Sequence, residues 1–445
     1  MFNKVLIANR GEIAARVART CSRLGVKSVA IYSDADWGAP HTEAANEAHY
    51  VGAAPVAHSY LNIERIIDIA QHTGCDAIHP GYGLLSENVA FINAIQTVGL
   101  TFIGPHANNV ELMGDKQRAR AFARDCGIPI VPGSDEITDS QQAKEFAERM
   151  GYPILVKAAA GGGGIGMKVA KNDKALVKAI DECRRRGKSA FGDDKIYLEQ
   201  YIADPRHVEI QILADNHGNA LHLFERECSV QRRHQKVIEE APSVLMSQFP
   251  TLREKMTSAA LTLTRKAQYV NAGTVEFIVD TNGNYYFIEM NTRLQVEHPV
   301  TESITGLDLV ELQLLIATGQ PLPMKQNEVL MGGHAIECRI YAENPDKMFL
   351  PSPGTIGTYL EPENVRVDSG VKGNWDVVSF YDPMIAKVIA HADTRELATR
   401  KMISALSEYK IGGLKNNLMM HIKVLDSDVF QQGSFNTLWL EKFMQ

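Results

Sequence analysis

Residues 274 to 291, with the sequence TVEFIVDTNGNYYFIEMN, constrain the fold more tightly than any other stretch of the chain. Two runs rich in β-branched and aromatic residues flank Asn282-Gly283, the strongest short-range signal for a β-hairpin. A two-residue type I′ turn fixes the register, and counting outward from it places Glu276 directly opposite Glu289. Like charges in this position are destabilising, because the two Cβ atoms lie only about 5 Å apart. The hairpin therefore predicts a third group that compensates the two carboxylates.

A divalent cation is the compensating group that the neighbouring residues favour. Asn291 lies two residues beyond Glu289 and projects from the same face of the strand, so it supplies a third oxygen. Two carboxylates and an amide, without His or Cys, suit Mg²⁺ or Mn²⁺ held against nucleotide phosphates. Two alternatives stay open: both carboxylates point to solvent, or the loop is longer and the register differs.

The residues that follow the hairpin alternate in a way that suits an oxyanion. Arg293, Gln295 and Glu297 occupy every second position and share one face if the segment is extended. A forked donor, an amide and a carboxylate beside a metal can bind a small planar oxyanion and remove its proton. The alternative is a ladder of ion pairs on the surface.

A glycine run, KAAAGGGGIGMKVA, matches the dinucleotide fingerprint by spacing alone. That fingerprint requires a helix after the glycines, and here the residues after Gly166 have the pattern of a second strand. The run therefore predicts a hairpin whose glycine tip closes over phosphates through backbone N–H groups, the alternative being a plain turn or linker. Lys116 and Lys157 are candidate charge partners for those phosphates.

The order of apolar runs predicts several layers of strands and helices. Strands at 4–9 and 28–36 enclose a helix at 13–25, and the pattern recurs to about residue 110, which favours a parallel sheet with helices on its faces. The sequence GIPIVPG marks a hinge near residue 130, and longer strands follow residue 203.

Composition excludes several classes of protein. The 445 residues suffice for two or three domains, and the net charge of −7 does not indicate nucleic acid or an anionic membrane as a partner. Six scattered cysteines form no metal or disulfide pattern and fit a reducing compartment. No apolar run reaches the roughly 18 residues that span a bilayer, and the first residues are too charged for a signal peptide. We expect a cytoplasmic protein.

In its motifs the chain resembles the biotin carboxylases of the ATP-grasp superfamily. The matching motifs run in order along almost the whole chain: IANRGEIA, AIHPGYGLLSEN, MGDK, KAAAGGGGIGM, PRHVEIQ, QRRHQKVIEEAP, FIEMNTRLQVEHPVTE and GHAIECRIYAE. The resemblance implies an α/β fold of three parts. These are an N-terminal parallel α/β domain (1–113), an ATP-grasp domain (114–330) whose residues 130–203 form a mobile lid, and a C-terminal α+β biotin carboxylase domain (331–445).

The resemblance also implies a role for individual residues. The expected ATP contacts are Lys116, Lys157, Gly163, Gly164, Glu199, Gln200, Ile202, His207, Gln231 and His234. The expected ligands of two Mg²⁺ or Mn²⁺ ions are Glu276, Glu289 and Asn291. Bicarbonate would be bound by Lys236, Arg293, Gln295 and the backbone of Val296, with Glu297 as its general base, and Arg339 would stabilise the enolate-like form of biotin.

The implied reaction is the first half-reaction of an acyl-CoA carboxylase. ATP phosphorylates bicarbonate to carboxyphosphate, which delivers CO₂ to biotin. The Met-Lys pairs of this chain lack the β-rich context of a biotin-bearing module, so we expect biotin on a separate carrier protein and a separate carboxyltransferase. A homodimer is expected, and neither nucleic acid nor a membrane is an expected partner. The alternative is another ATP-grasp ligase acting on a carboxylate or bicarbonate.

Overall fold

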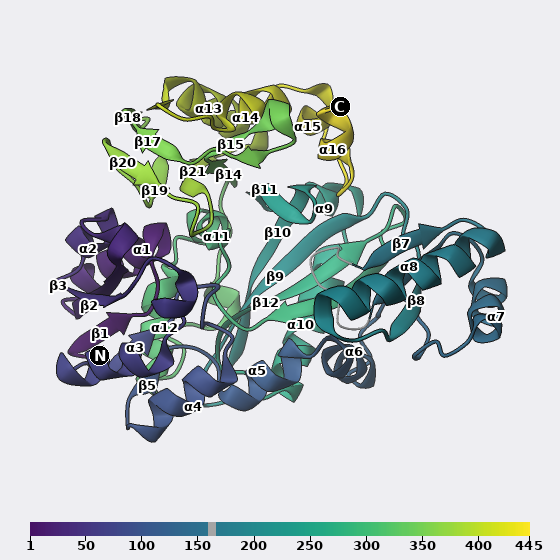
Figure 1. The fold of residues 1–445 in the computed structure, drawn as a ribbon, viewed down its shortest axis with the longest axis horizontal. Helices are drawn as coiled ribbons and strands as arrows, with labels where there is room; N and C mark the ends of the chain where they lie inside the picture. The colour runs from purple at the N-terminus through teal and green to yellow at the C-terminus, as the bar shows by residue number, and fades with distance from the viewer. Residues whose placement is uncertain (159–165) are drawn as a thin grey trace.

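The computed structural model describes residues 1–158 and 166–445, and its N-terminal part forms a parallel α/β layer (Figure 1). Five strands pair in the order β3-β2-β1-β4-β5, and their parallel pairing confirms the parallel sheet that the alternating pattern predicts. Their bounds are β1 Lys4–Ile7, β2 Lys27–Ser33, β3 Glu47–Gly52, β4 Ala77–His79 and β5 Thr101–Phe102. The main helices are α1 Gly11–Arg23, α3 Ile63–His72, α4 Val89–Thr97 and α5 Ala107–Gly114. Apolar residues of β1 and α1 pack in one core with residues of the central part of the chain, so this layer is firmly attached.

A small module with its own core follows helix α6, Lys116–Asp125 (Figure 1, right). Its antiparallel sheet has the order β7-β6-β8, with strands β6 Ile154–Ala158, β7 Met167–Ala170 and β8 Ile196–Gln200. Helices α7 Ser140–Met150 and α8 Asp173–Phe191 complete it. The antiparallel pairing of β6 with β7 confirms the hairpin predicted around the glycine run. Gly163 and Gly164 lie outside the described residues.

An eight-stranded sheet forms the centre of the molecule, in the order β13-β12-β9-β10-β11-β14-β21-β19. Its strands are β9 Arg206–Ala214, β10 Ala220–Arg232, β11 Gln235–Ala241, β12 Asn271–Val279, β13 Tyr285–Asn291, β14 His334–Tyr341, β19 Arg366–Ser369 and β21 Met384–Ala392. Helix α10, Leu252–Lys266, covers β9 and β10, and α11, His298–Thr305, lies against β10, β11, β14 and β21. Because β11 pairs with β14, one continuous sheet joins the middle of the chain to its C-terminal part.

The acidic hairpin formed by β12 and β13 differs from its predicted form at the turn. Asp280 and Asn284 close a three-residue loop in which Gly283 has φ +80°, so the two-residue type I′ turn is wrong. The longer loop alone would shift every pair by one residue. A β-bulge at Ile288 then shifts the pairing back, and Glu276 lies opposite Glu289 as predicted. The predicted register at these two residues is therefore correct because two irregularities cancel.

The C-terminal helices pack on the other face of β11, β14 and β21 (Figure 1, top). They are α13 Arg395–Glu408, α14 Leu418–Leu425, α15 Asp428–Gln431 and α16 Trp439–Phe443. Within the described ranges, we find no helix with the length and apolar character needed to cross a membrane.

Candidate active site

A cavity of about 1260 Å³ opens where the three parts of the fold meet. Ligand pockets in proteins commonly measure about 300 to 1,000 Å³, so this one has room for more than one substrate. Every predicted site residue that the structure describes lines it: Lys116, Lys157, Glu199, Gln200, Ile202, His207, Gln231, His234, Lys236, Glu276, Glu289, Asn291, Arg293, Gln295, Val296, Glu297 and Arg339. The fold thus brings together residues separated by more than two hundred positions in the chain.

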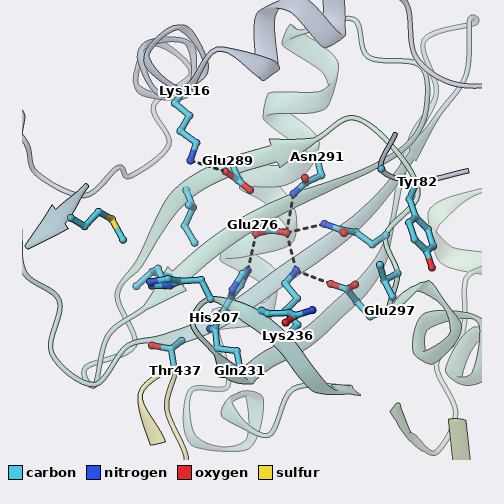
Figure 2. Close-up of a pocket in the computed structure, with 18 of the residues that line it drawn as sticks. Tyr82, Lys116, His207, Gln231, Lys236, Glu276, Glu289, Asn291, Glu297 and Thr437 are labelled. Atoms are coloured by element: carbon cyan, nitrogen blue, oxygen red, sulfur yellow. Dashed lines mark hydrogen bonds and ion pairs between the residues drawn. The ribbon is translucent and has the colours of Figure 1, made fainter. Parts of the chain in front are cut away.

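Glu276 lies at the centre of the polar side chains in this cavity (Figure 2). Its Oε1 accepts hydrogen bonds from Lys236 Nζ at 2.9 Å, Asn291 Nδ2 at 2.9 Å and Gln295 Nε2 at 2.8 Å. His207 Nε2 lies 2.9 Å from Oε2. Although burial alone would raise the pKa of Glu276, the charges of Lys236 and His207 hold it well below its usual value. The carboxylate is therefore ionised at neutral pH.

Three carboxylates line up across neighbouring strands at this point. The ladder pairs Glu289 of β13 with Glu276 of β12, and Glu276 with Glu209 of β9. Lys116 Nζ lies 3.7 Å from Glu289, which remains about one third exposed. Glu276, Glu289 and Asn291 offer hard oxygen ligands at the wall of the cavity, so this donor set fits Mg²⁺ or Mn²⁺.

Two other groups of metal-capable side chains also meet here: His207, Glu209 and Glu276, and Glu209, Cys228 and Glu297. The ammonium of Lys236 contacts both groups, since its Nζ lies 2.5 Å from Glu209 Oε2 and 2.7 Å from Glu297 Oε1. Lys236 thus already compensates Glu209 and Glu297, and of the residues in these two groups only Glu276 also belongs to the oxygen donor set that fits a metal.

Glu297, the predicted base, is fully buried between two cations. Lys236 contacts its Oε1, and Arg339 Nη2 donates to its Oε2 at 2.8 Å. Burial alone would raise the pKa of Glu297, yet Lys236 and Arg339 hold it well below the usual range. The three carboxylates around Lys236 overcome its burial and raise the pKa of its ammonium well above the usual value. Both groups are charged at neutral pH.

The predicted oxyanion residues form a chain of hydrogen bonds that ends on the N-terminal domain. Arg293 donates from Nη2 to Asn291 Oδ1 and from Nη1 to Gln295 Oε1, both at 2.8 Å. Its Nε donates to Glu87 at 2.8 Å. The segment between β13 and α11 is not an extended strand, because it bends at Arg293 and turns at Val296 and Glu297, the N-cap of α11. The alternation expected for an extended segment is therefore wrong. The side chains nevertheless converge on the cavity.

Three of the predicted ATP residues, Lys157, Glu199 and Gln200, come from strands β6 and β8 of the small module. Lys157 Nζ lies 2.6 Å from Glu199 Oε2, and Arg120 Nη1 lies 2.8 Å from the other oxygen of the same carboxylate. His234 lies in the tight turn between β10 and β11, and burial lowers the pKa of its imidazole. The pairing of Lys157 with Glu199 keeps a cation at the foot of the glycine hairpin.

Sequence reasoning missed four residues that support this site: Glu87, Glu209, Arg226 and Lys387. Glu209 could have been found, since it lies two residues after His207 and shares its face of β9. Arg226 is the largest fully buried side chain and donates to Glu209, Gln211, Thr274 and Thr301. Nothing local in the sequence distinguishes it from a surface arginine.

One cavity is lined by the acidic hairpin of β12 and β13 and by strands β6 and β7 of the small module, and this is the arrangement of an ATP-grasp enzyme. Family models match the chain in three consecutive segments. They are "Biotin carboxylase, N-terminal domain" over residues 1–110, "Carbamoyl-phosphate synthase L chain, ATP binding domain" over 115–325 and "Biotin carboxylase C-terminal domain" over 337–442. The chain belongs to the biotin carboxylase family.

Individual relatives are similar to this chain along almost their whole length. The chain is 52% identical to biotin carboxylase 2 of Bacillus subtilis over 447 residues, covering 100% of both chains. It is 51% identical to the biotin carboxylase of Haemophilus influenzae over 446 residues, covering 99% of both chains. A solved biotin carboxylase domain dimer of Hydrogenobacter thermophilus 2-oxoglutarate carboxylase, in complex with MgADP, ADP and bicarbonate, is 46% identical. It superposes with a TM-score of 0.93, covering 99% of this chain and 98% of that one. The protein is therefore an enzyme, a biotin carboxylase.

Proposed function

We propose that this enzyme uses ATP, Mg²⁺ and bicarbonate to carboxylate biotin on a separate carrier protein, through carboxyphosphate. The single observation that carries the proposal is the position of Lys236. Its ammonium joins the metal-binding carboxylate Glu276 to the buried carboxylate Glu297, at 2.9 and 2.7 Å. The groups that we propose for phosphate transfer and for proton transfer therefore meet at one point of the cavity.

In the first stage, bicarbonate binds among Lys236, Arg293, Gln295 and the backbone of Val296. Glu297 accepts the proton of bicarbonate, and the resulting oxyanion attacks the γ-phosphorus of ATP while ADP leaves. Bound Mg²⁺, held by Glu276, Glu289 and Asn291, supplies Lewis-acid stabilisation of the phosphate charges. Lys116 and Lys157 add positive charge on the lid side.

In the second stage, carboxyphosphate breaks down to CO₂ and phosphate next to biotin. The released phosphate takes the N1′ proton, and the nitrogen attacks CO₂. Arg339 stabilises the negative charge that develops on the ureido oxygen of biotin. Closure of the lid excludes water from carboxyphosphate, which would otherwise hydrolyse.

The proposed enzyme works within a larger carboxylase system. We assign residues 1–113, 114–330 and 331–445 to three domains, with 130–203 as a lid that moves on the hinge near residue 130. The carboxylated carrier would pass its CO₂ group to a carboxyltransferase, and relatives named for pyruvate and for 2-oxoglutarate carboxylases leave the final acceptor open. A homodimer is supported by the dimeric relative. A cytoplasmic location is supported by six free cysteines, five of them buried.

One assay tests the proposed reaction. ATP hydrolysis should depend on bicarbonate and should rise when free biotin is added, since biotin consumes carboxyphosphate. ATP hydrolysis that does not depend on bicarbonate, or that biotin does not stimulate, would contradict the proposal.

A further inference from the structure

Two glutamates that the reaction does not use face each other behind the active site. Glu239 of β11 pairs directly with Glu337 of β14, and both side chains are completely buried. They lie on the face of the sheet that helix α11 covers, where Ala241, Ala335 and Ile389 pack against Val300 and Ile304. Opposed residues in a sheet place their Cβ atoms about 5 Å apart, so two charges here would repel strongly in an apolar setting.

The pair connects to the catalytic groups through one atom of Arg339. Nη2 of Arg339 lies 2.5 Å from Glu239 Oε1 and also donates to Glu297 Oε2 at 2.8 Å. The contact with Glu239 is an ion contact that lacks hydrogen-bond geometry. Within the described part of the chain, neither oxygen of Glu337 has a hydrogen-bond partner.

The charges that surround the pair do not balance if every carboxylate is ionised. Lys387 of β21 is a buried cation on this face, and its Nζ is already engaged by Glu12 at 3.1 Å and by the Val296 carbonyl at 2.8 Å. The buried guanidinium of Arg226 is likewise engaged, by Glu209 and Gln211. The remaining titratable neighbours are Lys236 of β11, the thiols of Cys228 and Cys338, and His298 of α11. Lys236 is shared by three other carboxylates, the thiols are neutral, and burial keeps His298 neutral. Among the described residues, Arg339 is then the one cation in contact with Glu239, and no cation contacts Glu337.

We propose that Glu337 holds a proton at neutral pH, so that ionised Glu239 serves as the counter-ion that positions Arg339. The protonation of Glu337 does not depend on the proposed function. Only its consequence for catalysis rests on that function. When Glu297 takes the proton of bicarbonate, it loses the charge that held Arg339. Glu239 keeps its own charge, so Arg339 stays in place to meet biotin.

The direction of the pKa shifts agrees with this assignment. Burial raises the pKa of Glu337 well above the usual value, and Lys387 does not offset it. Burial also raises the pKa of Glu239, to about 7, although Arg339 opposes the shift. The proton therefore resides on the glutamate without a close cation.

Infrared spectroscopy tests the proton on Glu337 directly. Wild-type protein at pH 7.5 should show the carbonyl stretch of a buried protonated carboxylic acid, and Glu337→Gln should lose it. Glu254→Gln, the same change at an exposed residue of α10, should keep it. Absence of the band from the wild-type protein overturns the proposal whether or not a variant folds, and so does a band that survives in folded Glu337→Gln.

Enzyme kinetics test whether Glu239 positions Arg339. Glu239→Gln should lower kcat for carboxylation of free biotin about tenfold and leave bicarbonate-dependent ATP hydrolysis without biotin near the wild-type rate. Equal losses in both activities would show a general structural defect and contradict the role assigned to Glu239. If wild-type protein shows the infrared band and does not carboxylate biotin, the proposed function fails while the assignment of the proton to Glu337 stands.

Discussion

Glu276 has four polar neighbours, which come from three separate parts of the chain. Lys236, Asn291 and Gln295 donate to its Oε1, and His207 approaches the other oxygen. A carboxylate with so many donors is held in one orientation before any ligand arrives. Such preorganisation fits the role of metal ligand that we propose for Glu276.

Replacement of this carboxylate should abolish metal-dependent turnover. Glu276→Gln keeps the size of the side chain and removes the charge, so we expect kcat to fall at least about 100-fold at limiting Mg²⁺. Circular dichroism should show an intact fold, because Lys236 keeps Glu209 and Glu297 as partners. The matched control is Glu64→Gln at an exposed position of α3, which should have wild-type kinetics. Wild-type rates for Glu276→Gln at limiting Mg²⁺ would refute the metal assignment.

A second buried carboxylate gives a prediction about stability and pH. Arg395 lies 2.7 Å from Glu240 and His334 lies at the same distance, and although burial opposes it, they lower the pKa of Glu240 to about 2. A lowered pKa stabilises the folded protein above the unfolded pKa of about 4.3, and the contribution is lost as the pH falls from there toward 2. Glu240→Gln should therefore reduce the free energy of unfolding by about 3 kcal/mol at pH 7.

Urea titrations of wild type and Glu240→Gln at several pH values measure this difference. It should be constant from pH 8 to about pH 5 and should narrow below about pH 4.3. A difference that widens as the pH falls would show that the sign of the pKa shift is wrong.

At the scale of elements, the acidic hairpin shows how far sequence reasoning reaches. The strands, their pairing and the opposition of Glu276 to Glu289 follow from residue pattern and turn chemistry. The three-residue loop and the bulge at Ile288 do not, because both depend on packing. In a regular strand Phe287 and Glu289 would share a face, and the bulge instead lets Phe287 enter the core while Glu289 opposes Glu276.

The packing of this hairpin loop can be tested by replacing each of two glycines with alanine. Gly283 has φ +80°, and a Cβ added there would lie 2.6 Å from the ring of Phe249. Gly218, in the turn between β9 and β10, has φ +86° and open space around the added atom. Gly218→Ala should cost about 1 kcal/mol of unfolding free energy from backbone strain alone, and Gly283→Ala about 1 to 2 kcal/mol more. Equal costs in urea denaturation would show that Phe249 does not constrain the loop.

At the scale of the whole molecule, the sequence predicts the layers better than the way they join. The N-terminal sheet and the lid hairpin agree with their patterns. The junction of β11 with β14 joins segments about one hundred residues apart, and the contacts of Glu87 with Arg293 and of Lys387 with Val296 cross between domains. No local pattern encodes such pairings, because each depends on how separately folded layers dock.

The small module of β6, β7, β8, α7 and α8, which we propose to be a lid, has its own apolar core, and this leads to a prediction about cooperativity. Its apolar cluster is distinct from those of the central sheet, so it should open locally at lower free energy. Native-state hydrogen exchange should show faster exchange in β6 and β8 than in β9 and β10. A non-hydrolysable ATP analogue should slow exchange in the lid more than in the central sheet. Uniform protection across both regions, unchanged by nucleotide, would contradict a lid that closes over ATP.

The most direct test of the proposed reaction follows carbon from bicarbonate to biotin. Purified enzyme is incubated with ¹⁴C-bicarbonate, MgATP and free biotin, and carboxybiotin is isolated under alkaline conditions. We expect label in biotin that requires ATP and bicarbonate, and that disappears in Glu297→Gln. ATP hydrolysis by the wild-type enzyme without any label in biotin would contradict the proposed reaction.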